Sequence, residues 1–171
     1  MKRTDLQPDE FGAYYLNYIE QVDPELDLIQ AFNQSRTKDF FQKIPDSGYS
    51  SKYGADKWTI GEVFQHIIDS ERVFTYRMFR VGRGDQTPLP GFDQNVFMAP
   101  SRATEKSKID LLTEFAATRS FTLSVVNSFV DPDWKRIGEA SGNPLSARAS
   151  AFIILGHEIW HTNIIEERYS Y

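Results

Sequence analysis

The sequence predicts an all-α protein that folds as a four-helix bundle with one long crossover connection. Four long segments carry apolar residues at the 3.6-residue spacing of an amphipathic helix. The second and third of these segments are joined by a long connection rich in Gly and Pro. No repeat, low-complexity tract or linker divides the 171 residues, so we expect one domain that spans residues 1–171.

The first helix is predicted to begin at Asp23, which can cap it. Pro24 then takes the first helical position, and Glu25 places an acid in the first turn. The helix should continue through the following apolar residues: Ile29, Phe32, Phe40 and Phe41. Pro45 is expected to stop it. An aromatic stretch over residues 11–22 precedes this helix and is long enough to form a separate one.

The second helix has the most clearly marked start. Thr59 and Glu62 form a capping box, in which each side chain accepts a hydrogen bond from a free backbone N–H. Apolar residues follow at helical spacing: Ile60, Val63, Phe64, Ile67, Ile68 and Phe74. Gly82 and Gly84 are predicted to end the helix.

The remaining two helices are predicted from about Ser107 to Phe129 and from Ser146 to about Arg168. When extended, the segment over residues 83–106 can span the full length of the second helix. The second and third helices can therefore run parallel. Residues 131–145 include Gly, Asn and Pro residues that favour turns and a small hairpin.

Composition excludes several classes of function. The chain has no Cys, which excludes disulfides, thiolate metal ligands and a Cys nucleophile. The net charge of −5 argues against a surface that binds nucleic acid. The longest apolar run, over residues 151–155, is too short to cross a membrane, and the first residues lack the apolar stretch of a signal peptide. These features predict a soluble, cytoplasmic protein.

The three His residues form the main candidate for a functional site. His157 and His161 lie four residues apart in the fourth helix, so their imidazoles share one face at about 6 Å. His66 lies in the second helix, and alone it would be interpreted as a core residue bonded to a backbone carbonyl. All three occur in apolar helical stretches, where burying unrelated imidazoles would be costly. Together they predict a site for a divalent metal ion.

Three imidazole ligands leave coordination positions open, which is typical of catalytic rather than structural sites. Zn or Ni is favoured as the metal, with Fe, Mn or Cu as alternatives. Such a metal can lower the pKa of bound water or stabilise a bound thiolate. Because the chain has no Cys, the thiolate would come from a cosubstrate. Binding should weaken below pH about 6.5, where imidazoles become protonated.

The string from His157 to His161 also matches H-E-x-x-H, in which Glu158 would be the general base of a metalloprotease. A metalloprotease site needs a third metal ligand, which comes from a separate element later in the chain. Only a short helical tail follows, and the Gly and third His of the extended motif are absent. We therefore disfavour a protease. Glu158 instead lies about 100° around the helix from His157, where it can reach the edge of the site or pair with a basic residue.

Other residues are weaker candidates. Asp69 and Ser70 follow His66 by three and four residues and can orient a ligand, while Glu62 is explained by its capping role. Three arginines could hold an anionic substrate, with ordinary surface pairing as the alternative: Arg102, Arg119 and Arg148. The loop over residues 83–93 is interpreted first as a simple crossover, and as an alternative it could cover the mouth of the site.

Several segments resemble the DinB family, over nearly the whole chain. They are Lys57–Arg72 (KWTIGEVFQHIIDSER), Arg83–Asp93 (RGDQTPLPGFD), Ser146–Arg148, Gly156–Glu158 with His161, and Glu167–Tyr169. The resemblance implies an up-down-down-up four-helix bundle, a homodimer, and a divalent metal on residues matching His66, His157 and His161. Characterised members of the family that the chain resembles include metal-dependent enzymes that use small thiols, such as bacillithiol S-transferases and mycothiol-dependent isomerases. Relatives often have His where this chain has Trp160, which indicates a changed surface or pocket wall.

The sequence thus supports a metal-dependent enzyme that transfers a small thiol to an electrophile or, as a second choice, hydrolyses a small molecule. The alternative is a non-catalytic binding or stress-response module that metal stabilises. A purely structural bundle with core histidines is the third reading.

Overall fold

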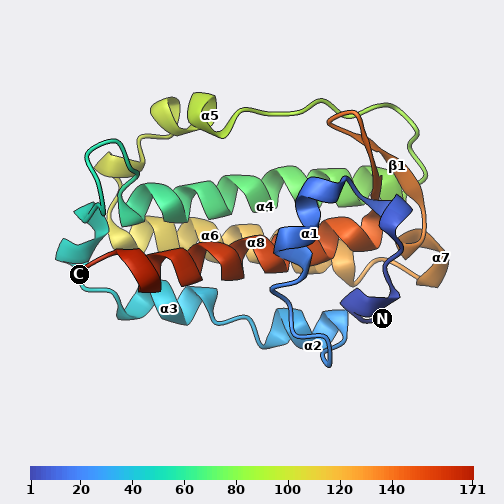
Figure 1. Ribbon diagram of the computed structural model, residues 1–171, viewed down its shortest axis with the longest axis horizontal. Coiled ribbons are helices and arrows are strands. Elements are labelled where there is room, and N and C mark those ends of the chain that lie inside the picture. Colours follow the sequence, from blue (N-terminus) through green and yellow to red (C-terminus); the bar gives the residue numbers. More distant parts are fainter.

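The structure, a computed structural model, describes all 171 residues, and most of them are helical (Figure 1). Its bundle contains three long helices and a fourth position shared by two short ones: α4 (Ile60–Gly82), α6 (Lys108–Val126), α8 (Ala147–Arg168), and α2 (Leu28–Asn33) with α3 (Thr37–Lys43). Figure 1 shows α4 and α6 running in one direction and α8 and α2–α3 in the other. This confirms the up-down-down-up bundle with a crossover between the second and third helices.

The predicted first helix is wrong in its start and in its continuity. Asp23 accepts a hydrogen bond from the backbone N–H of Glu25 (2.8 Å) and so stabilises a turn. The helix is capped instead by Asp27, which accepts from the Gln30 N–H at 2.9 Å. It then breaks at residues 34–36, because residues 33–36 carry no apolar side chain and include weak helix formers. Ser35 at this break donates to Glu158 (2.7 Å).

The aromatic N-terminal stretch forms 3₁₀ turns and one short helix, α1 (Leu16–Ile19). It packs closely on α8, and a Cβ atom at Gly156 would lie 1.8 Å from the backbone oxygen of Tyr18. Only glycine permits this approach.

The caps of the long helices follow the sequence prediction. Thr59 accepts from the Glu62 N–H at 3.1 Å, and Glu62 accepts from the Thr59 N–H at 2.7 Å. Ser146 caps α8 by accepting from the Ala149 N–H at 3.0 Å. Helix α6 ends at Val126, before the predicted Phe129.

The crossover contains a short helix that the sequence did not predict, α5 (Gln94–Ser101). Asp93 caps it by accepting from the Asn95 N–H at 2.8 Å. After α6 come α7 (Asp131–Trp134) and the expected hairpin of β1 (Ile137–Ala140) and β2 (Asn143–Ser146). The hairpin turns at Ser141 and Gly142, both with positive φ, as two-residue turns require.

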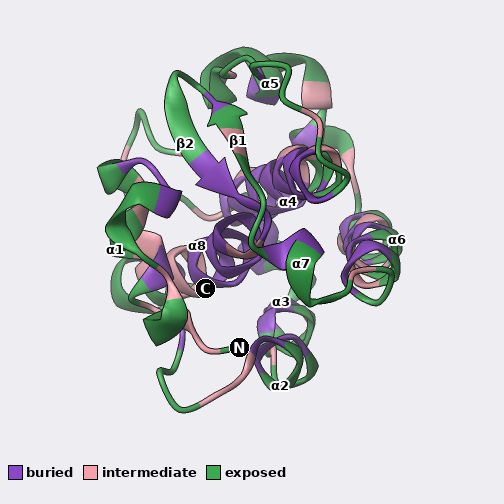
Figure 2. Cartoon of the chain, turned by 90° about the vertical axis from the view of Figure 1, so that its right-hand side faces the viewer, coloured by how far each residue is buried: buried purple, intermediate pink, exposed green.

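Helix α8 forms the centre of the core. Figure 2 views the bundle from one end and shows α8 near the middle, with α4, α6, α2–α3 and α1 around it. Every residue from Ala149 to Glu158 is buried. This run contains the longest apolar stretch of the chain and also the first of the two His residues on α8. None of the helices is long and apolar enough to span a membrane.

Candidate metal centre

The structure brings the three His side chains together. One ring nitrogen of each residue lies within 4.8 Å of the corresponding atoms of the other two, and the Nε2 atoms of His66 and His157 are 3.0 Å apart. His66 comes from α4, while His157 and His161 come from adjacent turns of α8. The convergence follows from the packing of α4 against α8, because each helix turns an apolar face, and the His residues within it, toward the other.

Burial keeps these imidazoles neutral. His66 and His157 are buried and His161 is half-buried. Burial lowers the pKa of His66 to about 4, and burial together with the nearby His66 lowers the pKa of His161 to about 3. The pKa of His157 falls well below its usual value for the same reasons. Neutral imidazole is the form that binds metal ions.

The donor set suits a divalent metal ion. Between two neutral Nε2 atoms only one proton can be shared, so three converging imidazoles cannot satisfy one another by hydrogen bonds. A metal bound at about 2.0–2.1 Å from each nitrogen would hold two such atoms roughly 3 Å apart. His66 also has an orienting neighbour, because Ser70 Oγ lies 3.5 Å from its Nδ1.

Two cavities open beside the cluster. His66 and His157 line a cavity of about 510 Å³, whose walls include Ser70, Phe74 and three tyrosines: Tyr14, Tyr15 and Tyr18. His161 lines a neighbouring cavity of about 280 Å³ with Trp58. Residues Gln94 and Asn95 line both. The crossover therefore covers the site, as one of its two sequence interpretations proposed.

Aromatic rings surround the imidazoles, and of these only Trp160 had been considered from the sequence. The Tyr18 ring meets the His157 ring edge-on, with centroids 5.2 Å apart, and the Trp58 ring lies 5.1 Å from that of His66. Trp160 packs edge-on against Tyr18 at 5.8 Å. Helical spacing carried no sign of these contacts, because Tyr18 lies far from the His residues along the chain and Trp58 precedes the helix that carries His66.

The carboxylates near the His residues lie elsewhere. Asp69 accepts hydrogen bonds from Gln65 (3.1 Å) and Arg72 (2.9 Å), and no hydrogen bond joins it to an imidazole. Glu62 stays at the helix cap. Glu158 is buried and bonds to Ser35 and Arg119, on a different face of α8 from His157.

The three predicted anion-binding arginines line neither of the two cavities beside the His cluster. Arg119 makes two hydrogen bonds to Glu71, at 2.8 and 2.9 Å, and a further ion pair with Glu158. Arg148 pairs with Glu10. Arg102 is exposed and follows α5 with a positive φ of 53°.

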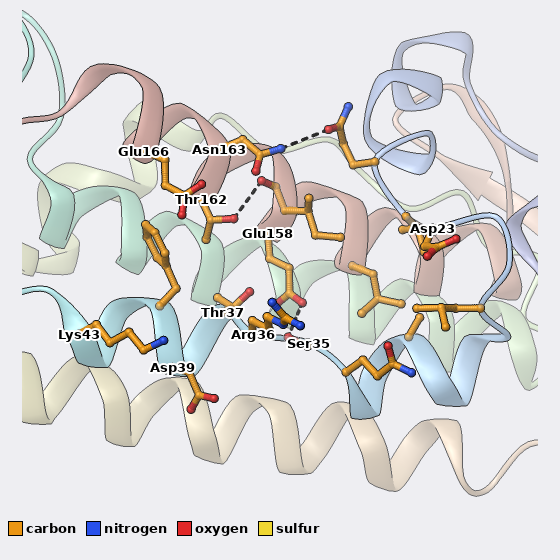
Figure 3. Close-up of a pocket in the computed structure, with 18 residues that line it drawn as sticks. Asp23, Ser35, Arg36, Thr37, Asp39, Lys43, Glu158, Thr162, Asn163 and Glu166 are labelled. Carbon is orange, nitrogen blue, oxygen red and sulfur yellow. Dashed lines mark hydrogen bonds between the residues drawn. The ribbon is translucent and has the colours of Figure 1, made fainter.

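A larger pocket, of about 690 Å³, lies between α8 and α2–α3. Figure 3 shows Glu158, Thr162 and Asn163 of α8 on one side, with Ser35, Arg36 and Lys43 on the other. No His lines it. The sequence gave no indication of this pocket, because it arises where the predicted first helix breaks.

Comparisons with known proteins agree with the fold. Among solved structures, YfiT from Bacillus subtilis, described as "a probable metal-dependent hydrolase with an unusual four-helix bundle topology", has a TM-score of 0.68 at 15% identity and covers 82% of this chain and 85% of its own. A mycothiol-dependent maleylpyruvate isomerase has a TM-score of 0.63 at 11% identity; the match covers 94% of this chain but 60% of the isomerase. At these identities both show the shared fold.

A search of curated protein sequences gave no match. The family model of the DinB superfamily matches residues 31–165, which include most of the bundle and all three His residues. This confirms the resemblance noted in the sequence. The chain belongs to the DinB superfamily.

Proposed function

We propose that the protein is a metal-dependent enzyme in which His66, His157 and His161 hold a divalent metal ion, with Zn or Ni favoured over Fe or Mn. One observation carries the proposal: three neutral imidazoles, two of them buried and one half-buried, converge beside a cavity large enough for a small molecule. The preferred reaction transfers a low-molecular-weight thiol to an electrophile, and hydrolysis is the second choice. We place this reaction in the cytoplasm, where thiols stay reduced.

When bound, the metal supplies a lower pKa for a thiol or water at the open coordination position. The chain itself contributes the remaining functions. Ser70 orients the His66 ring, and Tyr18 and Trp58 fix the planes of the His157 and His66 rings by edge-on and tilted packing. The aromatic walls exclude water from the reacting atoms.

The metal content of purified protein tests the site itself. We expect about one equivalent of metal in wild type after growth with Zn, Ni, Fe and Mn, and almost none in His66→Ala. Asn163→Ala, an exposed change on α8, serves as the matched control and should keep the metal. Equal and negligible metal in wild type and His66→Ala would refute the proposal.

Turnover tests the reaction. A panel of thiols and electrophiles is incubated with the metal-loaded protein, and the loss of free thiol is measured with a thiol reagent. The chain has no Cys, so the protein adds no background. We expect consumption in wild type and loss of activity in His161→Ala with an intact circular dichroism spectrum.

The second candidate is a non-catalytic module that metal stabilises. It is favoured by the position of the ligands, which would link the two helices α4 and α8 at the centre of the core. It predicts a strong drop in melting temperature after metal removal and no turnover with any thiol or ester in the panel.

The homodimer implied by the resemblance is part of the proposal as well. Light scattering on an eluting size-exclusion peak would measure the mass directly, and a mass of 19.7 kDa would contradict it.

A further inference from the structure

Arg77 is a buried cation without a counter-ion. Its side chain on α4 is only 1% exposed, and no carboxylate forms an ion pair with it. Its Nη2 donates to the backbone oxygen of Pro90 at 2.8 Å and to Ser141 Oγ at 3.0 Å. Its Nη1 is buried and has no hydrogen-bond partner. Among the buried side-chain nitrogen and oxygen atoms of the chain, this is the only one left without a partner.

An unpaired buried guanidinium is unfavourable, because both its charge and its N–H donors lose their hydration. The other largely buried arginines of the chain avoid this cost. Arg119 pairs with Glu71 and Glu158, and Arg148 pairs with Glu10. Arg77 has instead two aromatic rings beside it, Phe74 at 5.1 Å and Phe92 at 5.7 Å. The open donors of Nη1 therefore point to a negatively charged partner outside the chain.

The position of Arg77 relates it to the His cluster. His66, Ser70, Phe74 and Arg77 follow one another at spacings of four, four and three residues, which places them on one face of α4. Eleven residues along a helix correspond to about 16 Å. Long helical side chains lean toward the helix N-terminus, and the contact with Phe74 shows that Arg77 leans toward His66 in this way.

The immediate neighbours of the guanidinium are walls of the cavity beside the His cluster. Phe74, Phe92 and Ser141 each contact the Arg77 guanidinium, and each lines the 510 Å³ cavity together with His66 and His157. His66 and His157 line one part of this cavity, and the Arg77 guanidinium lies directly behind the wall that Phe74, Phe92 and Ser141 form.

We propose that Arg77 binds a carboxylate of the substrate or thiol cosubstrate, at the end of the cavity opposite its reacting group. The buried, unpartnered Nη1 offers two N–H donors, which suits a singly charged carboxylate better than a phosphate dianion that needs more donors. The ligand class is therefore a small molecule with a thiol or other metal-binding group at one end and a carboxylate at the other. This inference rests on the proposed function, because it identifies the substrate class of the same site.

Thiol binding to the Co(II)-loaded protein tests this inference, with the thiolate-to-cobalt absorption band as the readout. The probes are ω-mercaptoalkanoates of increasing chain length and the ω-mercaptoalkanols of equal length. Once the chain is long enough to reach Arg77, we expect the acids to bind about ten- to a hundred-fold more tightly than the alcohols, as for a hydrogen bond to a charged group.

Three variants identify the residue responsible. Arg77→Gln should remove the preference for the acids and leave the binding of the alcohols unchanged. Arg77→Lys keeps the charge but not the fork of donors, so it should keep part of the preference. Arg83→Gln removes an exposed charge from the end of the same helix, has no carboxylate to leave unpaired, and should keep all of the preference.

A second measurement needs no metal. Simple alkanoates should raise the melting temperature of the metal-free wild type, and alkanols of equal length should not. Arg77→Lys should show a smaller rise and Arg77→Gln none.

The outcomes separate the two proposals. If neither thiol class changes the cobalt spectrum, the proposed thiol chemistry fails, while the metal-free measurement still decides the role of Arg77. If acids and alcohols bind wild type equally, or if Arg77→Gln keeps the preference, the role of Arg77 is refuted and the thiol chemistry stands. If Arg77→Gln does not fold, the acid-to-alcohol ratios of wild type and Arg77→Lys decide in the same way.

Discussion

At the scale of single residues, the His cluster gathers every His of the chain at one largely buried place. The chain has three His residues, and all of them converge at one place. The sequence expectation that binding weakens below pH about 6.5 used the pKa of an exposed imidazole. Burial lowers the pKa of His66 to about 4, so the folded chain keeps this residue in its ligand form over a wider range of acidity.

The same shift predicts acid sensitivity of the metal-free protein. Below pH about 6.5 the unfolded chain takes up protons at His66, while the folded chain does so only near pH 4, so the free energy of unfolding falls as the pH falls through this window. His66 alone should contribute a loss of about 2 kcal/mol at pH 5 relative to pH 7. Urea unfolding at the two pH values measures it. His66→Gln should show a smaller pH dependence, and an equal slope in the two proteins would contradict the prediction.

A second prediction at this scale concerns Arg119, which lies between two buried acids. Arg119→Met leaves Glu71 and Glu158 buried without their cation and should lower the free energy of unfolding by about 3–5 kcal/mol. Arg36→Met, an exposed arginine beside the large pocket, should change it by less than about 0.5 kcal/mol. Similar losses in the two variants, measured by urea unfolding at pH 7, would contradict the prediction that the buried ion pairs stabilise the fold.

These residues show which parts of a site can be predicted from sequence. The spacing of His157 and His161 is local, and helix geometry converts it directly into a shared face. The partner of an arginine depends on helix packing instead. Arg119 and Arg148 were therefore grouped with Arg102 as anion-binding candidates, although the structure pairs the first two with Glu residues far away in the sequence. Arg77 was not singled out at all, because the lack of a partner is visible only in three dimensions.

At the scale of elements, the contact between α1 and α8 depends on one glycine. Gly156→Ala places a Cβ atom 1.8 Å from the Tyr18 backbone oxygen, so α1 must move away from α8. We expect a loss of about 1–3 kcal/mol in the free energy of unfolding, as for other overpacked sites. Gly54→Ala meets only the flexible Lys57 side chain at 3.2 Å and should be nearly neutral. Chemical denaturation of both variants checks this, and a neutral Gly156→Ala would show that α1 adapts freely.

The capping box of α4 gives a further prediction. Thr59→Ala removes the acceptor for the Glu62 N–H and should lower the free energy of unfolding by about 1 kcal/mol. Because His66 lies two turns further along the helix, the metal content of the variant should stay at the wild-type value. A large loss of metal in Thr59→Ala, measured on folded protein, would mean that the helix start also positions the site.

Elements with strong local caps were predicted well, and elements set by tertiary contacts were not. The capping box at Thr59 and the Ser146 cap mark helix starts because the bonds are made within one turn. Asp is a common N-cap residue, but Asp23 stabilises a local turn, and Asp27 caps the helix instead. The polar residues at the break between α2 and α3 weaken the helix locally, but the hydrogen bond of Ser35 to Glu158 is a tertiary contact that no local pattern reveals.

At the scale of the whole molecule, metal is expected to join two helices at the centre of the core. At a free metal concentration one hundred times the dissociation constant, binding adds about 2.7 kcal/mol to the stability. Removal by a chelator should then lower the melting temperature by roughly 5–10 °C. Scanning calorimetry of wild type and Asn163→Ala should show this shift, and His66→Ala should show none. A chelator effect in His66→Ala would place the bound metal elsewhere.

The overall topology was predictable from two facts of the sequence. Four long segments with apolar residues at helical spacing favour a bundle, and the long Gly- and Pro-rich segment allows α4 and α6 to run parallel. The helix within that segment, α5, was missed because it is only eight residues long and includes Pro100. The fold class can be predicted from the spacing of apolar residues. The path of the crossover depends instead on its tertiary contacts around the His cluster.

The crossover has a consequence for how this protein can diverge. Two parallel neighbours cannot be joined by a short turn, so the fold itself requires a chain segment that travels back along α4. Residues 91–95 of that segment line the cavity beside the three imidazoles. The segment that the topology requires thus also forms one wall of the cavity, and the bundle does not fix its sequence. We therefore expect substitutions there to alter ligand preference while the four helices and the three His residues stay unchanged, so that specificity can evolve separately from the chemistry.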